Sequence, residues 1–513
     1  MSQDAPISSI SETEPIKSHH SKERGGTLQE IRGDIFASAG FSVLVLSHNL
    51  AVLLNRGNSY YSRDAQHDYL LGWLVGLLIT TSFTYCVIRL YRRLPILRIP
   101  LTLVAIPASA FALYEFQLSV GLRLSPWVVA SVPAVLLFIG EAWRARNFGR
   151  IPKILGSAFR FSAFLAVVCV WSAVWGVLHP IRVVSYDSAT VPDAHAPIVW
   201  VIFDELDQGL LFDHRPPGIE LPTFDALRKK AVSFSNAQRP GPETLFSLPA
   251  LVIGKPVAGS VPVSEKDLRL SFNDGGSSLW SQTDSVFDSM KKLNRTSAIV
   301  GFYHNYGSVF AGKASHIRSE GYNFFGIPAA VEYQFWLFFP QPQRWETREK
   351  VGDLSLVIQA EVDQHKIYLA RQLADTRKAI TDWHCGFIFL HIGLPHAPWP
   401  KGTNDESHRG YLRNLVLTDS FLHEILLSLE TAGDLDSSTI IVTSDHNLRL
   451  PLQGSQMNEK VPLMIKFPGQ HDGLDISDNV DAVDLRWLIE QIAEGRVRTP
   501  QQAAEFLIDR CRG

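Results

Sequence analysis

The feature that most constrains this chain is a set of five apolar stretches in its first third, at residues 35–54, 69–88, 99–120, 125–142 and 161–179. Each has close to the ~20 residues that a helix needs to cross the hydrocarbon core of a membrane. Pro133 in the fourth stretch is compatible with a membrane helix. The stretches predict a five-span transmembrane domain over residues 34–180. The polar residues 1–33 are expected to form a disordered tail, not a cleavable signal.

The basic residues around these stretches predict an orientation. Thirteen lie before the first stretch or in the loops after the second and fourth, and three lie in the other two loops. The side with more Lys and Arg faces the cytoplasm, so the N-terminus is expected there. Five crossings then place everything after residue 180 outside the cytoplasm. Glu115, inside the third stretch, is either a functional carboxylate or an interfacial one that reaches water.

Overall charge and cysteine content exclude other classes of protein. The 513 residues include 48 basic and 51 acidic ones, so no excess of positive charge suggests nucleic-acid binding. The 4 cysteines have no CxxC spacing, which predicts neither a disulfide framework nor a cysteine metal site.

After a linker over residues 181–195, the pattern changes to short apolar runs that alternate with amphipathic segments. Runs rich in β-branched and aromatic residues occur at 197–203, 297–303, 385–392 and 438–444, as is typical of buried parallel strands. The segments between them, such as "LPTFDALRKKAV", have the pattern of amphipathic helices. This alternation predicts an exported α/β domain over residues 196–513, with a doubly wound, mostly parallel sheet.

Acidic residues and histidines follow three of these predicted strands. The ligand site of such a sheet gathers at the carboxyl ends of its strands, and carboxylates with imidazoles are suitable ligands for a divalent metal. Asp204 could instead be a helix N-cap and Asp445 a turn residue, but the coincidence at three strand ends favours a metal site. The residues concerned are Asp204, Glu205, His391, His396, Asp445 and His446.

Thr244, in "RPGPETLFSLPALVIGK", is the candidate reactive group. It precedes an apolar segment that could begin a helix, where free N–H groups favour a bound anion. A metal bound to its hydroxyl would lower the hydroxyl's pKa. The alternative is a simple N-cap threonine. Ser247 lies one turn later and is expected to have a supporting role.

Residues 196–490 resemble the sulfatase-like branch of the alkaline phosphatase superfamily. The resemblance rests on "IVWVIFDELD", on the segment from "LPTFDALRKKAV" to "LFSLPALVIGK", on "GFYHNYG" and on "STIIVTSDHN". Thr244 stands where true sulfatases have a Cys or Ser that is oxidised to formylglycine, which threonine cannot become. The sequence Thr-x-x-Ser-x-Pro is instead similar to bacterial phosphoethanolamine transferases, and lipoteichoic acid synthases also use a threonine. Both families share a five-span membrane anchor.

The resemblance implies a role for each matched residue. Thr244 would be the nucleophile and a metal ligand, with Asp204, Glu205 or both, Asp445 and His446 completing the metal shell. His391, His396 and His304 would contact the substrate, with a second metal as the alternative partner of His396. One or two divalent ions are expected, with Zn²⁺ favoured over Mn²⁺.

The chain also departs from these families. Phe302 replaces the lysine of a Gly-Lys-Trp-His motif, and Asn458 stands where the phosphoethanolamine transferases have a further histidine. Few cysteines are present, whereas those transferases are rich in disulfides.

The function expected from these features is metal-dependent transfer of a phosphate-linked group from a membrane lipid to an envelope glycan or lipid, through a phospho-Thr244 intermediate. The location expected is a bacterial cytoplasmic membrane, with the catalytic domain in the periplasm. Two alternatives stay open, a phosphodiester or sulfate-ester hydrolase with the same site and a non-catalytic envelope scaffold. The transferred group and the oligomeric state are not determined by the sequence.

Overall fold

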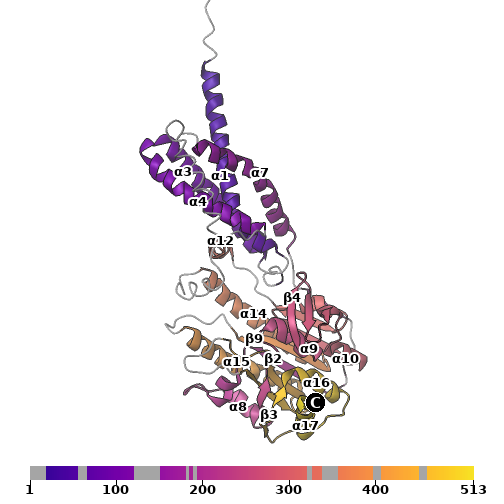
Figure 1. The fold of residues 1–513 in the computed structure, drawn as a ribbon. Coiled ribbons are helices and arrows are strands. Elements are labelled where there is room, and N and C mark those ends of the chain that lie inside the picture. Colours follow the sequence, from indigo (N-terminus) through magenta and orange to yellow (C-terminus); the bar gives the residue numbers. More distant parts are fainter. Residues whose placement is uncertain are drawn as a thin grey trace, which may run out of the picture. The chain divides into compact units, whose positions relative to one another are not determined.

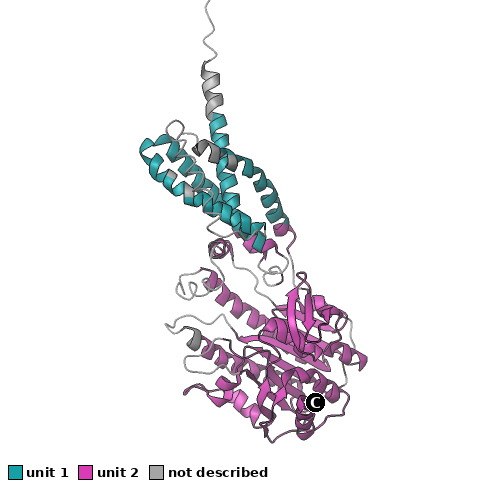
Figure 2. Ribbon diagram, viewed as in Figure 1, with its two compact units in different colours: residues 1–52, 73–175 teal, residues 53–72, 176–513 magenta. Residues whose placement is uncertain are grey.

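The computed structural model describes residues 19–55, 60, 66–120, 151–180, 184–188, 193, 195–320, 326–337, 356–396, 406–449 and 459–512. The chain forms two compact units (Figure 2). The first consists of residues 1–52 and 73–175, and the second of residues 53–72 and 176–513. The short segment 53–72, which lies between two membrane stretches in the sequence, therefore belongs to the second unit.

The first unit is helical (Figure 1). Its helices are α1 (His19–Leu54), α3 (Gln66–Arg93), α4 (Arg98–Ser119) and α7 (Ile151–Leu178), and the first residues of α3 belong to the second unit. Within the described residues, 4 helices are long and apolar enough to cross a membrane, and they coincide with four of the predicted stretches. The predicted stretch 125–142 lies outside the described residues. Helix α1 begins at His19, within the segment expected to be disordered, because the helix formers of "LQEIR" extend it ahead of the apolar stretch.

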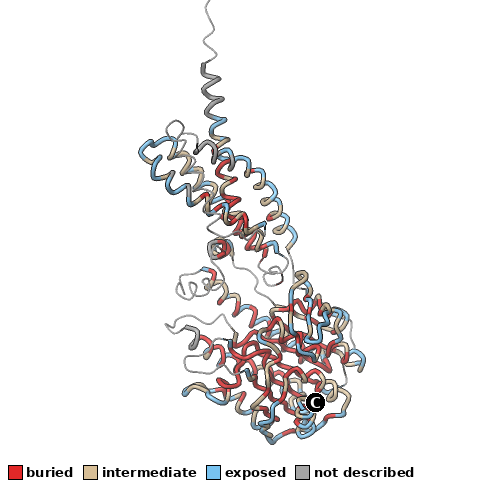
Figure 3. The backbone as a smooth tube through the Cα atoms, in the orientation of Figure 1, coloured by how far each residue is buried: buried red, intermediate tan, exposed pale blue. Residues whose placement is uncertain are grey.

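The surface of this helical unit is apolar. The exposed fractions of Phe83, Phe161 and Trp171 are 70%, 77% and 66%, and much of α7 is exposed along its length (Figure 3). A protein surrounded by water rarely exposes so many large apolar side chains together, so these helices are suited to contact lipid. Glu115 on α4 is 2% exposed, and its Oε2 has no hydrogen-bond partner among the described residues.

The second unit is built on a mixed, mostly parallel sheet with the strand order β1-β8-β7-β9-β2-β10-β11-β3-β12, with β13 also paired to β3. The strands are β1 (Tyr186–Asp187), β2 (Ile198–Asp204), β3 (Val232–Gln238), β7 (Ser297–Phe302), β8 (His316–Glu320), β9 (Phe387–Pro395), β10 (Thr439–Ser444), β11 (Lys460–Lys466), β12 (Leu474–Ile476) and β13 (Val480–Asp481). The four predicted apolar runs form β7, β9, β2 and β10, which are consecutive neighbours with all three pairs parallel. The prediction of a mostly parallel sheet is confirmed.

Helices cover both faces of this sheet. Along β2, Ile198, Trp200 and Ile202 face one core cluster, whereas Val199, Val201 and Phe203 face another. This alternation has the period of two that a strand imposes. The first cluster includes residues of α9 (Thr244–Ile253), α10 (Val286–Lys292), α11 (Tyr306–Phe310), α16 (Leu485–Ala493) and α17 (Pro500–Arg512). The second includes residues of α8 (Pro222–Arg228), α14 (Leu356–Thr381) and α15 (Glu406–Ala432).

A second, antiparallel sheet is formed by β4 (Val257–Pro262), β5 (Leu268–Phe272) and β6 (Ser277–Leu279). This sheet was not among the elements expected from the sequence. Its strands bury only isolated residues such as Val257 and Leu270, so they lack the continuous apolar runs of the main sheet.

Candidate active site

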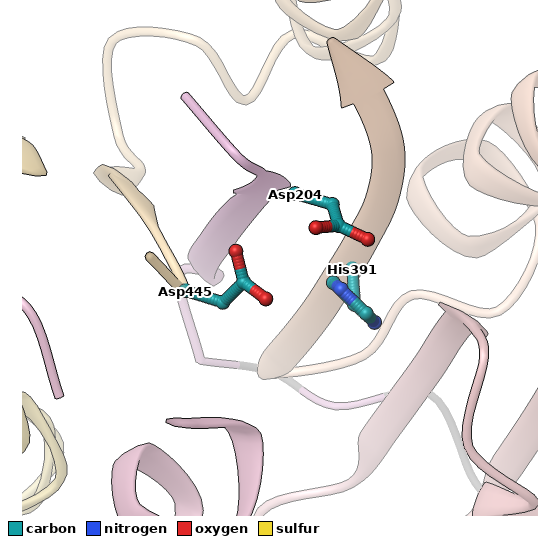
Figure 4. A group of neighbouring side chains, drawn as sticks. All are labelled: Asp204, His391 and Asp445. Carbon is teal, nitrogen blue, oxygen red and sulfur yellow. The ribbon is translucent and has the colours of Figure 1, made fainter. Parts of the chain in front are cut away.

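The carboxyl ends of three neighbouring strands bring Asp204, His391 and Asp445 together. Asp204 is the last residue of β2, His391 lies on β9, and Asp445 follows β10. Because β2 pairs in parallel with both β9 and β10, these positions meet at one edge of the sheet. One ligand atom from each residue lies within 4.8 Å of the other two (Figure 4). All three residues are buried.

Backbone carbonyls fix the orientation of two imidazole rings at this edge. His391 Nδ1 lies 3.0 Å from the carbonyl oxygen of Phe302, and His446 Nδ1 lies 2.9 Å from that of Asn447. Since a carbonyl oxygen can only accept, we assign the ring hydrogen to Nδ1 in both residues. The lone pair of each Nε2 is then free to act as a ligand, as is typical of histidines that bind metal. Burial lowers the pKa of His391 to about 4, which keeps it neutral.

The buried groups of this cluster fit a divalent metal ion. His391 Nε2 and Asp445 Oδ2 are buried and have no hydrogen-bond partner among the described residues. Burial, together with the nearby Asp445, raises the pKa of Asp204 to about 6. Unpaired polar atoms and adjacent carboxylates are costly in a protein interior, and a bound cation would compensate for both. The donors are carboxylate oxygens and imidazole nitrogens, as expected for Zn²⁺ or Mn²⁺.

Thr244 directs its hydroxyl at this cluster. It is the first residue of α9, and the residue at the N-cap position is Glu243, so the hydroxyl does not cap the helix. Thr244 Oγ1 lies 3.4 Å from Asp204 Oδ1 and 3.3 Å from His446 Nε2. The hydroxyl of Ser247 instead donates back to the carbonyl oxygen of Glu243, at 2.5 Å. The structure thus separates the two hydroxyls, and only that of Thr244 contacts the carboxylate and imidazole groups.

Glu205 occupies a different position from Asp204. Its backbone N–H donates to Asp445 Oδ1 at 3.1 Å, but its carboxylate accepts from Arg449 Nε at 3.0 Å. The backbone of Glu205 has φ 70°, a left-handed conformation that is unusual for a residue with a side chain. Although burial alone would raise the pKa of Glu205, the nearby His396, His446 and Arg449 hold it below its usual value. Glu205 is therefore bound to a guanidinium, outside the group of Asp204, His391 and Asp445.

Arg449 also lies at this edge, although it was not among the site residues expected from the sequence. Besides its contact with Glu205, its Nη2 lies 3.0 Å from His396 Nε2. Arg449 is partly exposed, so its guanidinium can also reach an anion. Phe302 stands where the related families have a lysine, and its ring stacks on that of Tyr368 at a centroid distance of 4.7 Å, so it brings no positive charge. Arg449 supplies a cation at this edge of the sheet. The available signal was a basic residue three positions after the Asp-His pair. Asn458 lies outside the described residues.

His304 lies beneath the threonine. Its Nε2 is 3.2 Å from the carbonyl oxygen of Thr244, its Nδ1 is 2.5 Å from the hydroxyl of Tyr60, and the residue is fully buried. The resemblance implies a contact with the anionic substrate. In the structure, the two ring nitrogens of His304 lie within hydrogen-bond distance of the Thr244 carbonyl oxygen and the Tyr60 hydroxyl, so His304 contacts the backbone of the candidate nucleophile.

A comparison with protein families identifies the family of this chain. The family model described as Sulfatase matches residues 197–485. Among solved structures, Ps i-CgsB is similar at 17% identity and TM-score 0.39, over 60% of this chain and 74% of that one. The phosphonate monoester hydrolase of Agrobacterium radiobacter is similar at 14% identity and TM-score 0.38, over 58% and 74%. The lipoteichoic acid synthase LtaP from Listeria monocytogenes is similar at 13% identity and TM-score 0.36, over 58% and 72%. No curated protein sequence matches the chain.

Proposed function

Since the chain belongs to the sulfatase family, we propose that it is a membrane-anchored, metal-dependent phosphotransferase with Thr244 as its nucleophile. The observation that carries the proposal is the position of Thr244 Oγ1, at the N-terminus of α9 and within 3.4 Å of both Asp204 and His446. A hydroxyl that neither caps its helix nor bonds back to it, but faces buried carboxylate and imidazole groups, is suited to attack an electrophile.

Asp204, His391, Asp445 and His446 would hold the metal, together with the Thr244 hydroxyl. When bound, the ion would lower the pKa of that hydroxyl and withdraw charge from the phosphoryl oxygens. In this proposal Glu205 does not bind the metal, and its carboxylate holds Arg449 in place. The alternative, Glu205 as a metal ligand, would require Arg449 to release the Glu205 carboxylate.

Other steps of the proposed reaction are assigned to side chains of the protein. The hydroxyl of Thr244 donates toward Asp204 Oδ1, so this carboxylate is placed to receive its proton. The Thr244 oxygen forms a bond to phosphorus as the bond to the lipid alcohol breaks, and an acceptor hydroxyl later displaces Thr244. The exposed part of Arg449 and His396, which Arg449 contacts, would bind the phosphoryl oxygens. The positive end of the α9 dipole favours the same anion.

The donor is proposed to be a phospholipid, and the acceptor a glycan or lipid of the cell envelope. The apolar helices α1, α3, α4 and α7 support this choice, because an enzyme that is anchored in a membrane encounters lipid substrates by diffusion within that membrane. We further propose a bacterial cytoplasmic membrane with the N-terminus on the cytoplasmic side and the catalytic domain on the other. A transmembrane domain over 34–180 and a catalytic domain over 196–513 complete this proposal.

The test is intact-mass analysis of the purified full chain after incubation with vesicles of phosphatidylethanolamine or phosphatidylglycerol. We expect a covalent adduct on the unmodified sequence that Thr244→Ala lacks. Equal labelling of both proteins would contradict the mechanism.

A hydrolase is the second candidate, and the match to the sulfatase family model favours it. It would use the same threonine intermediate with water as the acceptor. Product release is to be measured with and without envelope glycans. A transferase requires the glycan for turnover, whereas a hydrolase turns over equally well without it.

A further inference from the structure

A tyrosine from the segment between two membrane helices lies in the core of the sulfatase-like unit. Tyr60 is fully buried, in the same core cluster as Leu245 and Leu248 of α9 and Trp280. In the sequence it stands between α1 and α3, far from residue 176, where the main part of this unit begins. The core of this unit therefore includes a residue that is far in sequence from the main part of the unit.

The same segment is fixed to this unit at a second place. The rings of Tyr69 and Tyr333 stack at a centroid distance of 4.2 Å, and Gln334 Nε2 donates to the carbonyl oxygen of Tyr69 at 3.1 Å. Both partners lie on α12 (Gly326–Trp336). With two separate points of attachment, the position of Tyr60 in the core does not rest on one contact.

The hydroxyl of Tyr60 determines the hydrogen-bonding state of His304. The carbonyl oxygen of Thr244 can only accept, so His304 Nε2, which lies 3.2 Å away, carries the hydrogen. The Nδ1 atom is then an acceptor, and the Tyr60 hydroxyl, at 2.5 Å, donates to it. The rings of Trp280 and Tyr303 lie edge-on to the imidazole at 4.8 Å and 4.9 Å. A neutral ring suits these apolar surroundings, because burial penalises the charged form.

The chain of contacts ends at the candidate nucleophile. The Thr244 carbonyl belongs to the peptide that follows the Thr244 Cα, so a fixed carbonyl also restricts where the side chain of Thr244 points. That side chain must keep its hydroxyl between Asp204 and His446. Small displacements of a reacting atom reduce rates strongly. Loss of the Tyr60 hydroxyl as a donor to His304 Nδ1 should therefore disturb catalysis more than it disturbs folding.

We propose that Tyr60 is a positioning residue for the reaction, which orients Thr244 through His304. The proposal deepens the proposed function and rests on it for its effect on rate. It predicts that a Tyr60→Phe variant of the full chain, purified in detergent, loses about tenfold in turnover, while the KM for the lipid donor is unchanged. Tyr69→Phe, which keeps the stacked ring of the same segment, is the matched control and should retain full turnover.

A double-mutant cycle separates positioning from a general structural effect. If Tyr60 acts through His304, Tyr60→Phe should have no further effect in a His304→Phe background. An equal loss of turnover in both backgrounds would overturn the proposal, and so would full turnover of Tyr60→Phe in the original background.

Nitrogen NMR of protein with ¹⁵N-labelled histidine gives a readout that does not depend on activity. We expect a protonated Nε2 and an unprotonated, hydrogen-bonded Nδ1 for His304, with the Nδ1 signal shifting in Tyr60→Phe because its donor is lost. Unchanged His304 signals would refute the contact. If the unmodified protein shows no turnover with either lipid, the proposed function fails, and the NMR result still decides whether Tyr60 controls His304.

Discussion

Replacing Arg449 by methionine should destabilise the protein in a manner that depends on pH. The carboxylate of Glu205 is buried, with an exposed fraction of 4%. Its Oε1 accepts from both the Nε and the backbone N–H of Arg449, at 3.0 Å and 3.3 Å. Removing one partner of a fully buried ion pair costs about 3–5 kcal/mol. Because the side chain of Arg449 is 42% exposed and water can take its place, we expect a smaller loss of about 2 kcal/mol at pH 7.5.

The sign of the pH dependence follows from the pKa of Glu205. With Arg449 present, the pKa of Glu205 lies below its ordinary value, so the ion pair stabilises the fold above that ordinary pKa. Arg449 is one of the groups that lower the pKa of Glu205, so its removal raises that pKa, and the carboxylate takes up a proton more readily as the pH falls. The difference in stability between the two proteins should therefore be largest near neutral pH and should shrink toward pH 5.

The assay is thermal unfolding of the full chain in detergent at pH 7.5 and pH 5. Arg449→Met/Glu205→Gln should recover most of the stability at pH 7.5, because no buried charge is left unpaired. Arg228→Met is a matched control, since its partner Asp475 is exposed and the pair is worth little. Arg449→Met with unchanged stability at pH 7.5, or a double variant without recovery, would refute the reasoning.

Three further outcomes are expected. Thr244→Ala should lower turnover by about 1000-fold or more, whereas Thr244→Ser keeps a hydroxyl and should lose no more than about 100-fold in the same lipid assay. Burial lowers the pKa of His365 to about 3, so as the pH falls the unfolded chain binds a proton at this histidine before the folded protein does. Between pH 7 and pH 5, the unmodified protein should therefore lose about 2 kcal/mol more of its free energy of unfolding than His365→Phe does, as measured by denaturant unfolding. Equal losses in both proteins would contradict that assignment. His391→Ala should weaken Zn²⁺ binding by about 100-fold in chelator competition, whereas His423→Ala, at an exposed position, should not change it; equal affinities would exclude His391 as a ligand.

The strands at the centre of the sheet could be predicted because their burial is visible in the sequence. A strand covered on both faces needs apolar residues at every position, and "IVWVIFD" and "TIIVTS" are buried throughout. The β4–β5–β6 sheet could not be predicted in the same way, since a strand such as β4 is only partly buried. The order of the strands also depends on contacts between distant segments, which no local pattern records.

Some residues of the candidate site could likewise be predicted from the sequence, and others could not. Asp204, Asp445 and His446 could be placed because they follow predicted strands, and parallel strands end at one edge. The helix that begins at Thr244 was also predictable, although the direction of its hydroxyl was not. Tyr60 and Arg449 could not be placed. The first lies in a loop between membrane stretches, and the second follows the last strand without any periodic pattern around it.

The buried carboxylates at this edge of the sheet differ in whether a cation balances their charge. Glu205 has Arg449 as its cation, whereas Asp204 and Asp445 face each other and His446, whose ring hydrogen is already given to the carbonyl of Asn447. A neutral imidazole cannot balance two carboxylates, so the fold leaves negative charge at the point where Thr244 Oγ1 lies. A divalent cation there would balance that charge and contact the same hydroxyl. The stability of this edge of the sheet and the reactivity of Thr244 should then depend on the same ion, so chelation should reduce both together.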